Sequence, residues 1–92
     1  MTNYEKHLKE ELKNPVFKKE FEKEYRRIRL AYEMAQMRKK KKMSQEILAR
    51  KIGTTQSVVA RMESGKQNFS VDTLSKIADA FDCKLDIGFA RL

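Results

Sequence analysis

The chain has 92 residues, of which 40% are hydrophobic and 37% are charged, and its formal net charge is +8. A chain of this length forms one small domain, or one small domain with an arm. No apolar run approaches the roughly 20 residues of a membrane-spanning helix, and the charged N-terminus lacks the apolar core of a secretory signal. The single cysteine, Cys83, favours a reducing, cytoplasmic location and a packing role near a helix end.

Residues 1–25 are predicted to form a helical arm with six basic and six acidic residues. Residues 4–13 follow a short amphipathic pattern, in which Leu8 and Leu12 lie one turn apart. Asn14 and Pro15 then favour a new helix, because Asn caps a helix and Pro suits its first turn. Nothing from Val16 to Lys42 interrupts that helix.

Two apolar stripes run along this long predicted helix. The first recurs at steps of three and four residues and consists of Phe17, Phe21, Tyr25, Ile28, Tyr32 and Ala35. The second consists of Leu30, Met34 and Met37. Two stripes predict two surfaces, one facing the domain core and the other facing something else.

The positive charge is concentrated in residues 26–42, which hold eight Lys or Arg and one acidic residue, Glu33. A basic segment of this kind favours contact with phosphates. The run from Lys39 to Lys42 also suits the end of a helix, where cations complement the dipole. Both interpretations are compatible with the sequence.

The stretch from Met43 to Gly65 predicts two short helices joined by a tight turn. Ser44 is expected to cap the first helix, Gly53 to end it in a left-handed conformation, and Thr55 to cap the second. Small, polar and basic residues then face outward. This is the layout of a helix-turn-helix, whose second helix enters the major groove of DNA. The outward positions are Gln56, Ser57, Ala60 and Arg61.

The remainder of the chain is predicted to contain one helix and one strand. Ser70 caps a helix from Val71 to Phe81 with an apolar period of 3.6 residues. Residues 84–89 alternate apolar and non-apolar side chains, as a half-buried strand does. A lone strand has an unpaired edge, and a second copy of the chain is its simplest partner. The tail, residues 83–92, is therefore the candidate dimerisation segment, through Leu85, Ile87 and Phe89.

Residues 30–82 resemble the helix-turn-helix domain of lambdoid phage repressors and XRE-type regulators. The resemblance implies an all-α, lambda-repressor-like domain over residues 26–82, with five helices, in which the third reads DNA at about residues 55–64. The matching positions are Arg38, Met43-Ser44-Gln45, Leu48-Ala49, Ile52-Gly53-Thr54-Thr55-Gln56-Ser57, Met62-Glu63-Ser64-Gly65-Lys66, Leu74 and Ile77-Ala78.

The resemblance also assigns residue roles. Gln56 falls at a base-reading position, where a Gln amide pairs with adenine in bidentate fashion. Arg61 either reads guanine or contacts a phosphate, and Gln45 suits a phosphate at a helix N-terminus. The full predicted DNA-binding set is Gln45, Thr55, Gln56, Ser57, Arg61, Lys66 and Gln67.

In the family that these residues resemble, Arg38 and Glu63 match a partly buried ion pair that ties the first helix to the recognition helix. We therefore expect this pair to be structural. The apolar pattern predicts a core composed of Leu30, Met34, Met43, Leu48, Ala49, Ile52, Val59, Met62, Leu74, Ile77 and Phe81.

The arm resembles that of HigA-type antitoxins of HigBA toxin–antitoxin pairs, on the segment Leu12-Lys13-Asn14-Pro15-Val16-Phe17-Lys18-Lys19-Glu20-Phe21. This resemblance implies a RelE/HigB-like mRNA-interferase toxin as partner and autorepression of the shared operon. The alternative is a stand-alone XRE-family repressor with no toxin partner, in which the arm serves the dimer or senses a ligand. The arm itself either binds a partner, packs on its own domain or on a second copy, or is disordered. The toxin-binding candidates are Leu12, Phe17, Phe21 and Tyr25.

No enzyme, metal or cofactor site is predicted. The only histidine, His7, lies in the arm, and no Gly-rich phosphate loop or metal-ligand cluster is present. The expected mechanism is steric. A homodimer would place two recognition helices in successive major grooves, roughly 34 Å apart, on a palindromic operator.

Overall fold

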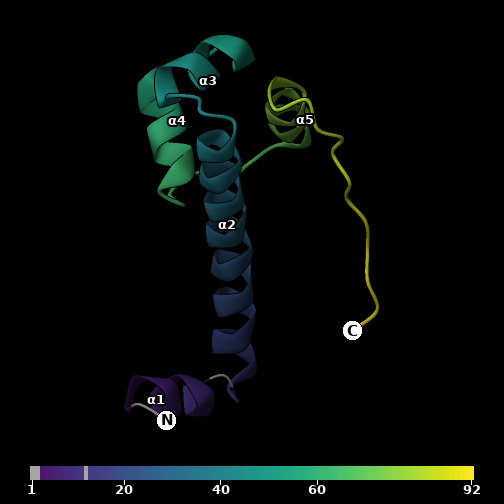
Figure 1. The fold of residues 1–92 in the computed structure, drawn as a ribbon. Coiled ribbons are helices and arrows are strands. Elements are labelled where there is room, and N and C mark those ends of the chain that lie inside the picture. Colours follow the sequence, from purple (N-terminus) through teal and green to yellow (C-terminus); the bar gives the residue numbers. More distant parts are fainter. Residues whose placement is uncertain (1–2, 12) are drawn as a thin grey trace.

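A computed structural model describes residues 3–11 and 13–92, and in these ranges the chain forms five helices and no strand (Figure 1). The expectation of an all-α fold is confirmed. No helix in the described ranges is both long enough and apolar enough to cross a membrane. The helices are α1 (Asn3–Glu11), α2 (Pro15–Lys40), α3 (Gln45–Ile52), α4 (Gln56–Glu63) and α5 (Val71–Ala80).

The starts of four helices are fixed by the caps that the sequence predicts. Oδ1 of Asn14 accepts hydrogen bonds from the backbone N–H groups of Val16, at 3.0 Å, and Phe17, at 3.4 Å, and Pro15 opens α2. The side chains at the starts of the three later helices each accept from the N–H three residues on. Each cap satisfies a donor that has no partner within its helix. These later caps are Ser44, Thr55 and Ser70.

The turn between α3 and α4 depends on a left-handed residue. Gly53 adopts φ +75° and ψ +36°, and the N–H of the next residue, Thr54, donates to the carbonyl of Ala49 at 2.9 Å. Glycine adopts this conformation without a Cβ penalty. The turn therefore sets the angle at which α4 leaves α3.

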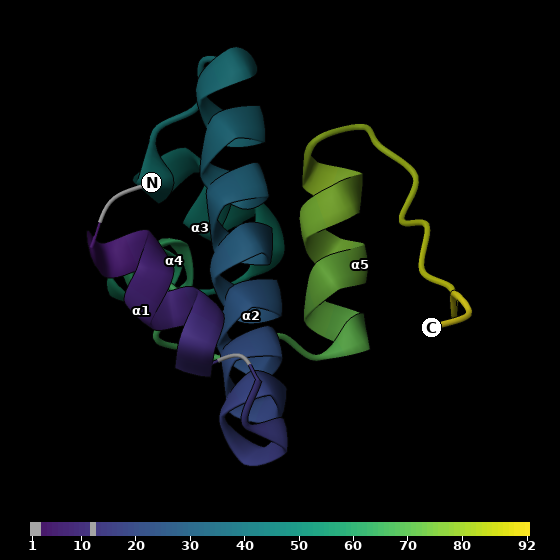
Figure 2. The same ribbon diagram turned by 90° about the horizontal axis from the view of Figure 1, so that it is seen from below.

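The core lies where α3 packs against α4 and α5, with α2 passing between α4 and α5 (Figures 1 and 2). Leu48 and Val59 are fully buried. Eight of the eleven predicted core residues are buried, while Met43 and Leu74 are half-buried. The eight are Met34, Leu48, Ala49, Ile52, Val59, Met62, Ile77 and Phe81.

Leu30 was wrongly assigned to the core. It is 37% exposed and lines an open groove between α2 and α5, together with Leu74. Its neighbour Ala31 is 2% exposed and takes the buried position instead. Successive helical residues lie about 100° apart, so a one-residue difference decides which side chain points inward.

The first half of α2 projects beyond the packed helices, and α1 crosses its end (Figures 1 and 2). The molecule measures 43 × 29 × 20 Å, and its radius of gyration is 15.8 Å. A compact chain of this length would have a radius of gyration of about 12 Å. The N-terminal part of the chain is therefore an extension of the domain, built on the same helix that enters the core.

The domain at residues 26–82 contains four helices, not the five that the resemblance implied. They are the second half of α2, then α3, α4 and α5, while the remaining helix of the described chain, α1, belongs to the arm. Residues 64–70 and 81–82 form turns and irregular backbone. The DNA-reading segment of the resemblance corresponds to α4.

The strand expected at residues 84–89 does not form. These residues continue from α5 as an extended segment that makes no backbone ladder with the rest of the described chain (Figure 1). A strand needs a second strand to satisfy its N–H and C=O groups, and the described part of the chain offers none.

Gly65, which follows α4, should tolerate alanine less well than Gly53. Both glycines have positive φ, +77° and +75°, but an added Cβ at Gly65 would lie 3.2 Å from Cγ1 of Ile28, whereas at Gly53 it would meet nothing within 4 Å. We expect Gly53→Ala to cost about 1–2 kcal/mol through its backbone conformation, and Gly65→Ala to cost clearly more. Urea unfolding of both variants measures the difference, and equal losses would contradict the close approach of Gly65 to Ile28.

Candidate nucleic-acid interface

The α4 helix has one buried face and one exposed face. Val59 is fully buried and Met62 is 5% exposed, so these side chains anchor the helix in the core. The predicted base-reading residues on the other side of α4 are exposed. They are Gln56, Ser57 and Arg61, and the capping residue Thr55 is exposed beside them.

The two glutamines of the predicted DNA-binding set are joined directly. Nε2 of Gln56 donates to Oε1 of Gln45 at 2.6 Å, and Nε2 of Gln45 donates to Oε1 of Glu63 at 3.2 Å. The Gln56 amide is therefore held in one orientation by the first residue of α3. Sequence reasoning identified both glutamines but not this link, because no spacing rule places the first residue of one helix beside the first residue of the next.

The network ends in an ion pair between α2 and α4. Nε of Arg38 lies 2.7 Å from Oε2 of Glu63, Nη2 donates to Oε1 at 3.0 Å, and Nη1 donates to the carbonyl of Met43 at 2.8 Å. The side chains are only 12% and 8% exposed. The pKa of Arg38 is raised above its ordinary value, because the hydrogen bond and charge of Glu63 outweigh the cost of burial.

Arg38, Glu63, Gln45 and Gln56 thus form one connected chain of hydrogen bonds, from a buried ion pair to an exposed amide. Such a network fixes the positions of α2, α3 and α4 relative to one another. The exposed amide at its end is available to recognise a hydrogen-bonding edge outside the protein.

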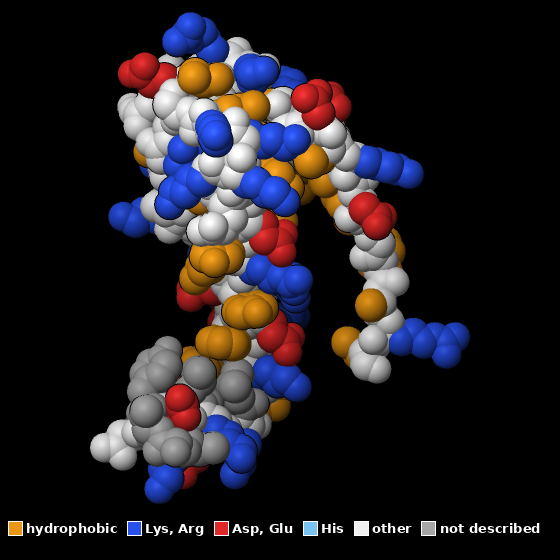
Figure 3. Space-filling view, in the orientation of Figure 1, with side chains coloured by type: hydrophobic (Ala, Val, Ile, Leu, Met, Phe, Trp, Pro, Cys, Tyr) orange, Lys and Arg blue, Asp and Glu red, His pale blue; other side chains and the backbone are white. Residues whose placement is uncertain are grey.

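Lysine and arginine side chains cover the end of the molecule that holds α3 and α4 (Figure 3). None of the exposed cations there forms an ion pair with another described residue. A group of exposed cations without ion-pair partners favours polyanion binding. These cations are Lys39, Lys40, Lys41, Lys42, Arg50, Lys51, Arg61 and Lys66.

The last two residues of the predicted DNA-binding set differ in exposure. Lys66 is exposed just beyond α4, while Gln67 is half-buried. Gln67 borders a small hollow formed with Gly53, Thr73 and Lys76. Lys66 is thus freer than Gln67 to reach a phosphate.

The arm candidates lie far along α2 from this surface. Phe17 and Phe21 are half-buried and Tyr25 is 54% exposed, and their rings stack in sequence. Leu12 lies outside the described residues. Among the predicted dimer residues, Leu85 is half-buried, while Ile87 and Phe89 are exposed.

The remaining chemically reactive residues have ordinary surroundings. Cys83 packs against the edge of the core, and its thiol donates to the carbonyl of Phe81 at 3.4 Å. Nε2 of His7 pairs with Oε1 of Glu11 at 2.6 Å within α1. In the described ranges, no cluster of His, Cys, Asp or Glu could hold a metal ion.

Helix-turn-helix architecture, an exposed recognition face and an unpaired basic surface define a DNA-binding module. A sequence profile of the helix-turn-helix family matches residues 34–87, and the chain belongs to this family of DNA-binding regulators. No curated protein and no solved structure matches the chain. The match begins at Met34, inside α2, so α1 and the residues of α2 before Met34 lie outside the family domain.

Proposed function

We propose that this chain is a transcriptional repressor in which α4 reads the bases of an operator in the major groove. The observation that carries this proposal is the oriented amide of Gln56, which stands at the exposed end of the network from Arg38. A Gln amide makes two hydrogen bonds with the N6 and N7 edge of adenine. Arg61 lies on the same exposed face and supplies either a guanine contact or a phosphate contact.

The repressor is proposed to act as a homodimer on a palindromic operator in the cytoplasm. Two copies of α4 related by a two-fold axis would enter major grooves roughly 34 Å apart. The tail supports a contact between copies, because Ile87 is 59% exposed and Phe89 is fully exposed on a segment with unpaired backbone groups. A second copy would supply both a hydrogen-bonding partner and apolar cover.

We further propose that the protein is an antitoxin that neutralises a RelE/HigB-like mRNA-interferase toxin and represses the operon encoding both proteins. Two observations support this role. The arm has the HigA-like segment described above, and the aromatic side chains of α2 lie outside the region matched by the family. DNA binding by the shared domain gives no reason for an exposed aromatic face at that place.

The two proposed surfaces are well separated. Phe17 and Arg38 are both in α2, and at 1.5 Å per residue they lie about 32 Å apart along its axis. A protein bound around Phe17 would therefore leave the basic end of the molecule open to DNA. Toxin binding and operator binding should be separable by mutation.

Copurification from cells that carry the gene with its flanking reading frames tests this function. Phe17→Ala should release the toxin encoded in an adjoining frame while leaving operator binding intact. Arg61→Ala should weaken operator binding while the toxin still copurifies. Val16→Ala, which removes a 74% exposed apolar side chain from another face of α2, is the matched control and should change neither.

The competing function is a stand-alone repressor. It would be supported if no small protein copurifies with the wild-type chain while operator binding persists. If the wild-type chain does not bind operator DNA, both proposed functions are contradicted.

A further inference from the structure

Arg27 lies on the core-facing side of α2 but has no acidic partner in the described part of the chain. At about 100° per residue, it is on the same side of the helix as Ala31 and Met34, which are 2% and 5% exposed. Arg38 is on this side too, and the carboxylate of Glu63 neutralises it. Arg27 is half-buried, and its Nε is buried without a hydrogen-bond acceptor among the described residues. An anion that reaches this guanidinium would therefore stabilise it.

The side chain of Arg27 lies against the segment that joins α4 to α5, which passes close beside α2 (Figures 1 and 2). Nη1 of Arg27 donates to Oδ1 of Asn68 at 3.4 Å, and this neutral amide does not balance the charge. The next residue of α2, Ile28, contacts the buried backbone of Gly65. These two contacts fall on either side of Lys66 in the sequence, and Lys66 is exposed. Arg27 and Lys66 therefore serve the same short segment.

Positive charge predominates around this segment. Residues 23–31, which extend about one turn to either side of Arg27, hold four Lys or Arg and one acidic residue, Glu24. Residues 64–70 hold Lys66 and no acidic residue, and the next carboxylate along the chain is Asp72 in the first turn of α5. Neither Glu24 nor Asp72 forms an ion pair with another described residue. The balance of charge favours an anionic ligand.

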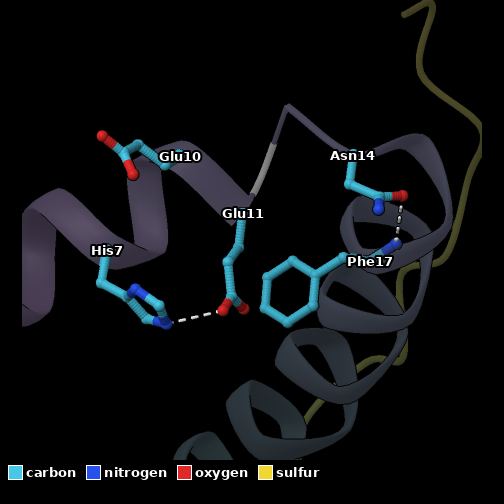
Figure 4. Close-up of a pocket in the computed structure, with 5 residues that line it drawn as sticks. All are labelled: His7, Glu10, Glu11, Asn14 and Phe17. Atoms are coloured by element: carbon cyan, nitrogen blue, oxygen red, sulfur yellow. Dashed lines mark hydrogen bonds and ion pairs between the residues drawn. The ribbon is translucent and has the colours of Figure 1, made fainter.

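The other end of α2 is acidic by contrast. The hollow where α1 meets α2 is bordered by Glu10 and Glu11, and its histidine, His7, pairs with Glu11 at 2.6 Å (Figure 4). Carboxylates repel the phosphates of DNA. Residue 27 stands about 15 Å further along the helix axis than Phe17, which also lines this hollow. A DNA backbone that reaches α2 would therefore approach it near Arg27 rather than near α1.

We infer that Arg27 contacts a DNA phosphate and that, together with Lys66, it makes the segment after α4 a phosphate-binding site of the operator complex. This inference rests on the proposed operator binding and adds a residue to that interface. Residue 27 precedes the family match at residues 34–87 and is absent from the predicted DNA-binding set. A guanidinium donates two parallel hydrogen bonds to a phosphate, and such contacts fix the register of a protein on the duplex.

Fluorescence anisotropy on operator and scrambled duplexes, between about 50 and 200 mM salt, tests the inference. Arg27→Gln removes the charge but keeps a side chain that can bond to Asn68. It should reduce the magnitude of the slope of log affinity against log salt by about one, and weaken binding to both duplexes by the same factor. Arg27→Lys keeps the charge and should keep the wild-type slope. The thermal midpoint of each variant verifies that the fold is intact.

Arg26→Gln is the matched control. Arg26 is exposed and borders the groove between α2 and the tail, about 100° around the helix from Arg27. Removing this charge should leave the slope unchanged, because the slope counts phosphate contacts rather than net charge. Asn68→Ala leaves the cation of Arg27 in place and should also preserve the slope.

Two results would overturn the inference. An unchanged slope for Arg27→Gln would show that Arg27 contacts no phosphate, and base reading by Gln56 would still stand. A loss of slope in Asn68→Ala equal to that in Arg27→Gln would mean that the arginine only holds the segment in place. Equal affinity of the wild-type chain for the two duplexes would instead contradict the proposed operator reading, while the slopes would still report on Arg27.

Discussion

Arg38→Ala is expected to lower the free energy of unfolding by about 3–5 kcal/mol, since it leaves the nearly buried carboxylate of Glu63 without its cation. The same change removes the hydrogen bond from Nη1 to the carbonyl of Met43. A domain of this size is stabilised by roughly 5–15 kcal/mol in total. The variant should therefore be marginally folded, which urea unfolding followed by circular dichroism will measure.

Arg29→Ala is the matched control on the same helix. Arg29 pairs with Glu33 at 3.2 Å, but the two side chains are 65% and 57% exposed. An exposed pair contributes roughly 0–1 kcal/mol. Equal losses for the two variants would contradict a structural role for the buried pair.

Wild type and Arg38→Ala differ in their free energy of unfolding. The titration of Arg38 should not reduce that difference between acid and neutral pH. Its pKa is raised above the ordinary value in the folded protein. A raised pKa gives a stabilising contribution that is complete below the unfolded pKa and is lost only as the pH rises through the folded value. For an arginine, that loss lies far above neutral pH.

Operator affinity should fall by roughly 10³–10⁵-fold between about 50 and 200 mM salt, if the exposed cations around α3 and α4 make about 6–10 phosphate contacts. Phosphate contacts release condensed cations from DNA, so salt opposes them directly. Fluorescence anisotropy of a labelled fragment from upstream of the gene gives the slope of log affinity against log salt.

Lys66→Ala should reduce the magnitude of that slope by about one, as expected for one lost phosphate contact. Lys18→Ala removes an exposed lysine from the arm, far from the basic end, and should leave the slope unchanged. An affinity insensitive to salt would contradict DNA binding through this surface.

The sequence predicted well those features that depend on a few neighbouring residues. Helix starts at Asn14, Ser44, Thr55 and Ser70 follow from hydrogen bonds between a side chain and the backbone two or three residues on. The turn at Gly53 follows from its need for positive φ. These preferences are local, and the tertiary packing of the helices is compatible with them.

The features that were missed depend on how helices are rotated and placed. Ala31 is buried in place of Leu30, because α2 is rotated so that the small side chain of Ala31 faces the core. The apolar period of the sequence does not determine this rotation. The residues of the tail alternate like a strand, but a ladder requires a second strand. The link from Gln56 through Gln45 to Glu63 arises only once α3 and α4 are positioned.

We propose that α4 reads base sequence through the oriented amide of Gln56. The most direct test compares wild type and Gln56→Ala on operator DNA and on a scrambled duplex of the same length and composition. Loss of a bidentate adenine contact should weaken operator binding by about 1–3 kcal/mol and leave binding to the scrambled duplex unchanged. An equal loss on both duplexes, or no loss on either, would show that Gln56 does not read a base.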